Sequence, residues 1–161
     1  MNSKSAEDGA VRNCSDYIAR DARLVRLLRI ADIAAVAVTV LAFLFGLGII
    51  LIVFPLGAVN YLAVLFIPFL VVTILRRWIN APRPESALGK SGGAFPSRHA
   101  FSAFAIGTLL CFISLPVGIL TLVFGILLSV SRVLLGIHFP RDVIAGALIG
   151  VVSGLIGACF I

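Results

Sequence analysis

Residues 33–75 read IAAVAVTVLAFLFGLGIILIVFPLGAVNYLAVLFIPFLVVTIL, without a single charged side chain. A helix that crosses a bilayer needs about 20 consecutive apolar residues. A stretch of this length therefore predicts two transmembrane helices. Pro55 and Gly57 lie near its middle, and proline and glycine mark turns, so we expect the two helices to be joined near residue 55.

The rest of the chain has the same apolar character. Of its 161 residues, 61% are hydrophobic and 12% are charged, whereas a soluble domain carries about 25% charged residues. Lipid is therefore the expected solvent. The net charge of +6 favours an anionic membrane surface or an anionic substrate over nucleic acid. The three cysteines, which are odd in number and far apart, indicate neither a disulfide framework nor a zinc site.

Three further spans are expected after a polar loop. The loop reads WINAPRPESALGKSGGAFPSRH, residues 78–99, and its prolines disfavour regular helix. The third span is expected to start near His99 and end near Ser114, the fourth to cover about 117–135, and the fifth to begin at Pro140, since proline suits a first helical turn. The predicted fold class is all-α, a polytopic membrane helix bundle of about five transmembrane helices within a domain of residues 31–161.

Residues 1–30 are expected to form a polar and basic N-terminal arm. Residues 1 to about 16 are polar, and we expect them to be disordered. Residues 17–30 combine four arginines with several leucines. This pattern is typical of a helix at the lipid interface, although a solvated lead-in to the first span explains it equally well.

The basic residues predict a common side for the arm and the loops. All of them lie in the arm, in the long loop with its flanking arginines, or in residues 132–141, while the turns near 55–58 and 115–117 are uncharged. Five spans would place the three basic regions on one face, which the positive-inside rule makes cytoplasmic.

Three clusters gather the ionisable residues that stand at the ends of the predicted spans. They are Arg76-x6-Arg83-Pro84, Pro96-Ser97-Arg98-His99, and Ser131-Arg132-x5-His138-x3-Asp142. Each has a simpler reading when taken alone: interfacial arginines anchor a span, PSRH starts a helix, and a histidine beside a proline sits in a turn. Ionisable groups at membrane depth are costly, so three clusters on one face indicate a functional site.

These residue types suit phosphoryl transfer. Guanidinium groups bind phosphate oxygens in pairs, Ser97 offers a hydroxyl donor, and the amides of Arg98 and His99 at a helix start can point at an anion. His138 can act as nucleophile if a carboxylate four residues away, Asp142, holds its other nitrogen. His99 then remains to protonate the leaving oxygen. A metal site is disfavoured, because the spacing matches no zinc pattern and the nearby arginines would repel a cation.

The three clusters resemble the three-part signature of the type 2 phosphatidic acid phosphatase superfamily. That signature is K-x6-RP, PSGH and SR-x5-H-x3-D, and residues 58–150 carry R-x6-RP, PSRH and SR-x5-H-x3-D in the same order. Three spaced motifs are far more specific than one. Arg76 replaces the family lysine and Arg98 the family glycine, and the chain has about five spans where many relatives have six with an external site.

The resemblance implies a role for each matching residue and implies no metal or other cofactor. His138 becomes phosphohistidine, Asp142 orients it, and His99 is the general acid. Arg76, Arg83, Ser97 and Arg132 bind the phosphate. Arg98 is not a family residue, and we expect it to join them through its amide at the helix start. The expected function is hydrolysis of a lipid phosphomonoester or diphosphate in a cell membrane. The alternatives are a lipid phosphotransferase with the same site and a catalytically silent lipid-binding protein.

Overall fold

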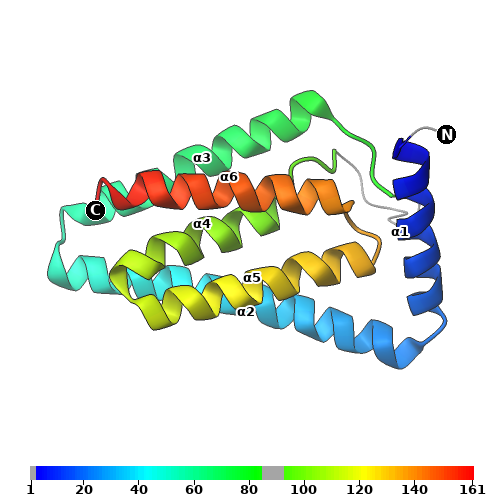
Figure 1. The fold of residues 1–161 in the computed structure, drawn as a ribbon. Helices are drawn as coiled ribbons and strands as arrows, with labels where there is room; N and C mark the ends of the chain where they lie inside the picture. The colour runs from blue at the N-terminus through cyan, green and yellow to red at the C-terminus, as the bar shows by residue number, and fades with distance from the viewer. Residues whose placement is uncertain (1–2, 85–92) are drawn as a thin grey trace.

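The computed structural model describes residues 3–84 and 93–161, and within them it contains helices and no strands. The helices are α1 (Ser3–Ala19), α2 (Ala22–Val53), α3 (Gly57–Ile79), α4 (Arg98–Ile113), α5 (Leu115–Leu134) and α6 (Pro140–Ala158). Five of them, α2 to α6, run roughly along one direction, and α1 stands across one end of the bundle (Figure 1). The predicted all-helical bundle is therefore confirmed.

The chain is an integral, multi-pass membrane protein. Helices α2, α3, α5 and α6 are long and apolar enough to cross a bilayer. Helix α2 has 32 residues, which corresponds to about 48 Å, so it is longer than the hydrocarbon layer of about 30 Å. Its first turns carry Arg23, Arg26 and Arg29, all exposed, and they suit the headgroup region.

Helix α4 is the short central helix of the bundle. It has 16 residues, fewer than a full span needs, and it contacts α2, α3, α5 and α6. Its closest neighbour is α6, whose Gly150 and Gly154 face it. A Cβ atom at Gly150 would lie 2.5 Å from the carbonyl oxygen of Phe101, and one at Gly154 would lie 2.7 Å from Cβ of Thr108. Small residues of this kind allow two membrane helices to approach closely.

The connections fall close to the predicted places. Helix α2 ends at Val53 and α3 begins at Gly57, so the first turn lies where Pro55 and Gly57 predicted it. A single residue, Ser114, separates α4 from α5, and Pro116 stands in the first turn of α5 rather than in the turn between them. Gly136 follows α5 with a φ of 63°, a conformation that glycine adopts without strain. The middle of the long loop, residues 85–92, lies outside the described residues.

The expected disorder is wrong for residues 3–16, because α1 occupies Ser3–Ala19, and residues 1 and 2 lie outside the described residues. Val11, Ser15 and Ile18 are buried and form a stripe on one face of α1, and the helix contacts α2 and α5. Asp21 then caps α2 by accepting hydrogen bonds from the amides of Arg23 and Leu24, at 2.8 and 3.3 Å. Helix α2 continues without a break through residues 30 and 31, and the division into an arm and a domain at that point stays a prediction.

The two ends of the bundle differ in what they contain. Helices α2, α4 and α6 begin at the end where α1 lies, and α3 and α5 finish there (Figure 1). The C-terminus lies at the other end, where Nδ2 of Asn60 donates a hydrogen bond of 3.0 Å to the carbonyl of Phe160. The N-terminal arm and the three clusters thus share one face, as five spans require. That this face is cytoplasmic stays a prediction.

Candidate active site

His138 and Asp142 form a buried pair where α6 begins. His138 is 1% exposed and Asp142 is fully buried. Nδ1 of His138 lies 3.5 Å from Oδ2 of Asp142, which is slightly longer than a hydrogen bond. Oδ2 also accepts a 3.0 Å hydrogen bond from the amide of Phe139, so the carboxylate caps the first turn of α6 while it faces the imidazole. Nδ1 of His138 faces the carboxylate of Asp142. Nε2 is therefore the ring nitrogen that can react with a substrate.

Ser97 joins the start of α4 to the start of α6. Its amide donates a 2.9 Å hydrogen bond to the carbonyl of Asp142, and its hydroxyl is buried without a partner among the described residues. A buried hydroxyl without a partner is costly, so Ser97 is suited to meet a ligand oxygen. The first amides of α4 also lack partners within the helix.

Arg76 and Arg83 hold the loops that carry the other two clusters. Arg76 is 8% exposed, and its Nη1 donates to the carbonyls of Ala94 and Pro96 at 3.4 and 3.3 Å. Nη1 of Arg83 donates to the carbonyl of Ile137 at 3.2 Å. Each arginine therefore reaches from its own cluster into a neighbouring one, and the three motifs are brought together as predicted.

Arg132 has a partner that the sequence did not reveal. Its Nε and Nη2 lie 2.8 and 3.0 Å from the two carboxylate oxygens of Asp32, and the two side chains are 11% and 16% exposed. Asp32 stands on α2, one hundred residues earlier in the chain. The available signal was its place as the last charged residue before the apolar stretch of 33–75, because a charge at membrane depth usually faces the bundle interior.

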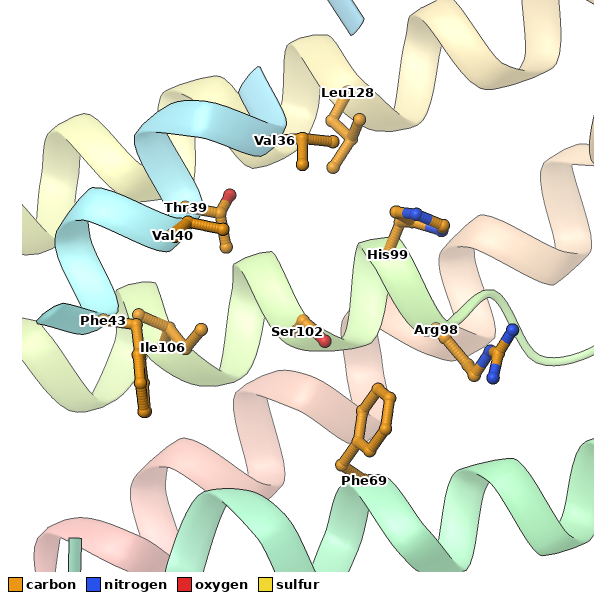
Figure 2. A pocket seen from close by; sticks show the side chains of 10 residues that line it. All are labelled: Val36, Thr39, Val40, Phe43, Phe69, Arg98, His99, Ser102, Ile106 and Leu128. Carbon is orange, nitrogen blue, oxygen red and sulfur yellow. The ribbon is translucent and has the colours of Figure 1, made fainter. Parts of the chain in front are cut away.

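Arg98 and His99 line a largely apolar groove between the helices. The groove has a volume of about 460 Å³ and is lined by residues of α2, α3, α4 and α5, namely Val36, Thr39, Val40, Phe43, Phe69, Arg98, His99, Ser102, Ile106 and Leu128. In Figure 2 the two ionisable side chains stand at one end, with Arg98 near Phe69 and His99 on the side of Val36 and Leu128. His99 is exposed, so a molecule in the groove could reach its ring.

The replacement of the family glycine by Arg98 causes no backbone strain. Arg98 is the first residue of α4, and among the described residues other than glycine the only positive φ belongs to Asn80. A side chain is therefore tolerated at this position, and it adds a positive charge beside the groove.

Burial and neighbouring charges set the protonation of the loop residues in this site. Burial lowers the pKa of His138, and the contact with Asp142 opposes that effect, while Arg83 and Arg76 lower the pKa further. His138 is therefore neutral at neutral pH, which is the form that can attack. Burial also lowers the pKa of Arg83, with Asp142 raising it and Arg132 and Arg98 lowering it. Charges from all three clusters therefore lie close enough to influence the pKa values of one another.

The described residues contain no group of three or more histidine, cysteine, aspartate or glutamate side chains placed to hold a metal ion. Whether catalysis needs a metal is a separate question, and metal independence stays a prediction that rests on the arginines. Taken together, the site offers four guanidinium groups, a free hydroxyl, a neutral imidazole beside a carboxylate, and a second imidazole on a groove wall. This set can bind a phosphoryl group and accept it on nitrogen.

Two solved structures share the fold. A transmembrane PAP2-type phosphatidylglycerolphosphate phosphatase from Bacillus subtilis superposes with a TM-score of 0.81 over 99% of this chain and 87% of its own, at 23% identity. LpxE of Aquifex aeolicus gives a TM-score of 0.60 over 84% of this chain and 92% of its own, at 26% identity. The first likeness, at that identity, shows the helical architecture alone.

Curated relatives match over shorter segments. Bacitracin transport permease protein BcrC of Bacillus licheniformis is 44% identical over 62 residues, 38% of this chain and 30% of its own. Phosphatidylglycerophosphatase B and undecaprenyl-diphosphatase BcrC of Bacillus subtilis are each 32% identical, over 48% and 39% of this chain. The matched segments span 44% and 33% of these two relatives, so the chain matches less than half the length of each curated relative.

The sequence model of the PAP2 superfamily matches residues 57–161, which is more than half of the chain and contains all three clusters. PAP2 denotes the type 2 phosphatidic acid phosphatases, the group that the three motifs resemble. The chain belongs to the PAP2 superfamily.

Proposed function

We propose that the protein is a membrane-bound phosphatase that hydrolyses a phosphomonoester or diphosphate of a lipid. The observation that carries this proposal is the buried pair of His138 and Asp142 beside the arginines, at the end of a membrane bundle and next to a largely apolar groove. The names of two relatives, a phosphatidylglycerophosphatase and an undecaprenyl-diphosphatase, support the class of substrate. Phosphatidic acid, phosphatidylglycerol phosphate and polyprenyl phosphates or diphosphates all fit it.

The first step would transfer the phosphoryl group to the protein. The guanidinium groups, the Ser97 hydroxyl and the amides at the start of α4 hold the phosphate oxygens and stabilise the charge of the transition state. Nε2 of His138 forms a bond to phosphorus as the bond from phosphorus to the lipid oxygen breaks, and that oxygen takes a proton from His99. Asp142 stabilises the charge that develops on the imidazole of His138.

The second step would regenerate the protein. A water molecule gives a proton to His99 and attacks phosphorus, the bond between phosphorus and Nε2 breaks, and inorganic phosphate leaves. His138 returns to its neutral form, which its buried position favours. The groove would hold apolar chain of the lipid close to the site, because its lining is mostly hydrophobic side chains.

Release of inorganic phosphate tests the proposal. The purified protein in detergent would be incubated with a panel of phosphatidic acid, phosphatidylglycerol phosphate, and polyprenyl phosphate and diphosphate, with the His138→Ala variant as control. We expect phosphate release from at least one lipid by the wild type and none above background by the variant. No release from any of these lipids, or equal release by the two proteins, would contradict the proposal.

A further inference from the structure

Asp32 is the one acidic residue of α2 that faces the site. It lies one turn before Val36 and on the same face as Thr39, Val40 and Phe43, which line the groove. Its side chain is 16% exposed, and both carboxylate oxygens contact the guanidinium of Arg132. Ser131 Oγ lies 3.4 Å from Oδ1, although its closer contact is the carbonyl of Leu128 at 2.9 Å. No part of the family signature extends to α2.

The contact uses a defined edge of the guanidinium. A guanidinium has five N–H donors in a rigid plane and can bind two anions along two different edges. Asp32 takes the edge formed by Nε and Nη2. The edge formed by Nη1 and the second hydrogen of Nη2 points away from Asp32 and matches the oxygens of a phosphoryl group.

An arginine that is held in one orientation stabilises a transition state more than a mobile arginine does. Arginine has many rotamers, and holding it in one of them costs entropy unless a partner does so beforehand. Donors that are oriented before the reaction contribute most to stabilising a transition state. The site also concentrates positive charge, since Arg132 and Arg98 both act on Arg83, and a carboxylate beside Arg132 reduces their repulsion.

We propose that Asp32 is a positioning residue, which holds Arg132 by one edge so that the opposite edge binds the phosphoryl group in the transition state. This inference rests on the proposed function and extends the site to α2. Helix α2 then forms part of the groove wall and also supports a phosphate-binding arginine. Asp32 acts through Arg132 and does not itself touch the substrate.

The test compares kcat and KM in Asp32→Asn. An asparagine offers one acceptor oxygen and an NH2 group that repels the second guanidinium N–H, so Arg132 loses its fixed orientation. We expect kcat to fall about 10- to 100-fold, because small displacements of catalytic groups cause rate losses of this size. KM is expected not to rise, because removing a negative charge favours binding of an anionic headgroup. Asp32→Glu, which keeps the charge, should give a kcat between those of Asp32→Asn and the wild type.

Two controls separate positioning from other effects. Asp21→Asn removes a carboxylate from the start of the same helix. The asparagine side chain can still accept the capping hydrogen bonds, so kcat and KM should not change. In an Arg132→Ala background, Asp32→Asn should cause no further loss, because the arginine through which Asp32 acts is gone. A further tenfold loss in that background would overturn the proposal.

A purely structural role would give a different pattern. It would lower the unfolding midpoint of Asp32→Asn and leave kcat at the wild-type value, and that result would overturn the proposal. If Asp32→Asn does not fold, Asp32→Glu decides, with a reduced kcat at unchanged KM supporting the proposal and a wild-type kcat overturning it. A wild type that releases no phosphate would overturn the proposed function as well, whereas an active wild type with an unaffected Asn variant overturns the role of Asp32 alone.

Discussion

The two ends of the helical bundle differ in the side chains that they carry. At the end away from α1, the turn after Val53, the single residue Ser114 and the segment after Ala158 carry no ionisable side chain other than Cys159. At the other end, the helix ends and the loops between them carry arginines, both histidines of the chain and the buried Asp142. Both ends meet a membrane surface, so the surface alone does not explain where the charges are.

This difference indicates that the charges at one end are arranged for a ligand. Arg76 and Arg77 illustrate it within one helical turn of α3. Arg76 is 8% exposed and binds backbone carbonyls of the neighbouring loop, whereas Arg77 is exposed. Burying a charged group is costly, and a fold tolerates this only where the charge is compensated or used.

Asp142→Asn should cause the largest loss among the single changes that keep the shape of the charged end. The amide can still cap α6, but it neither stabilises the developing imidazolium nor favours the reactive tautomer of His138. We expect kcat to fall by about 10³- to 10⁴-fold, the range for carboxylates that orient a catalytic histidine. Helix content by circular dichroism should be unchanged. A loss below about tenfold would show that the 3.5 Å contact is not used in catalysis.

Alanine at Arg76 and at Arg77 compares a buried with an exposed arginine in one helix. Arg76→Ala removes charge from the site and two hydrogen bonds to the adjoining loop, and we expect kcat/KM to fall about 10²- to 10³-fold. Arg77→Ala should change kcat/KM less than about twofold, since exposed surface charges contribute little. Equal losses in the two variants would mean that both arginines act as interfacial anchors.

The pH dependence of kcat/KM should report the burial of His138. Its ordinary pKa is about 6.5, and burial lowers it while Asp142 opposes this in part. Neutral imidazole is the attacking form, so activity should persist as the pH falls through 6.5 and decline only below the lowered pKa. The profile would be measured with a lipid substrate and compared with the titration of His138 by NMR. An acidic limb at or above pH 6.5 would be inconsistent with a buried neutral nucleophile.

Asn60→Ala tests the other end of the comparison and should have the smallest effect. It removes the exposed hydrogen bond to Phe160, which is worth about 0.5–1.5 kcal/mol. We expect a small decrease in the unfolding midpoint and a change in kcat/KM of less than about twofold. A tenfold loss of activity with intact folding would indicate that the uncharged end takes part in function.

The sequence allowed much of this architecture to be predicted, for reasons visible in particular residues. Long apolar runs separated near Pro55, Pro82, Pro116 and Pro140 place five helices, and the three motifs place the charged end. The helix α1 could not be predicted, because it lies in a polar segment and the buried stripe among its described side chains consists of Val11, Ser15 and Ile18. The helix packs against α2 and α5, and contacts of this kind cannot be predicted from the composition of the segment.

Long-range pairing explains what was missed in the site. Asp32 and Arg132 are separated by one hundred residues, and neither local spacing nor helical periodicity relates them. The exposure of His99 in a groove also depends on side chains from α2, α3 and α5. By contrast, His138 and Asp142 are four residues apart at a helix start, so their proximity could be predicted from spacing alone.

Capture of a phosphorylated protein tests the central claim most directly. The wild type, His99→Ala and His138→Ala would be mixed with lipid substrate labelled in its phosphate, quenched rapidly and digested for mass spectrometry. We predict an acid-labile, base-stable label on His138, increased in His99→Ala when the leaving group needs no proton, and absent in His138→Ala. Phosphate release by the wild type without such a label, or a label on another residue that persists in His138→Ala, would contradict the account.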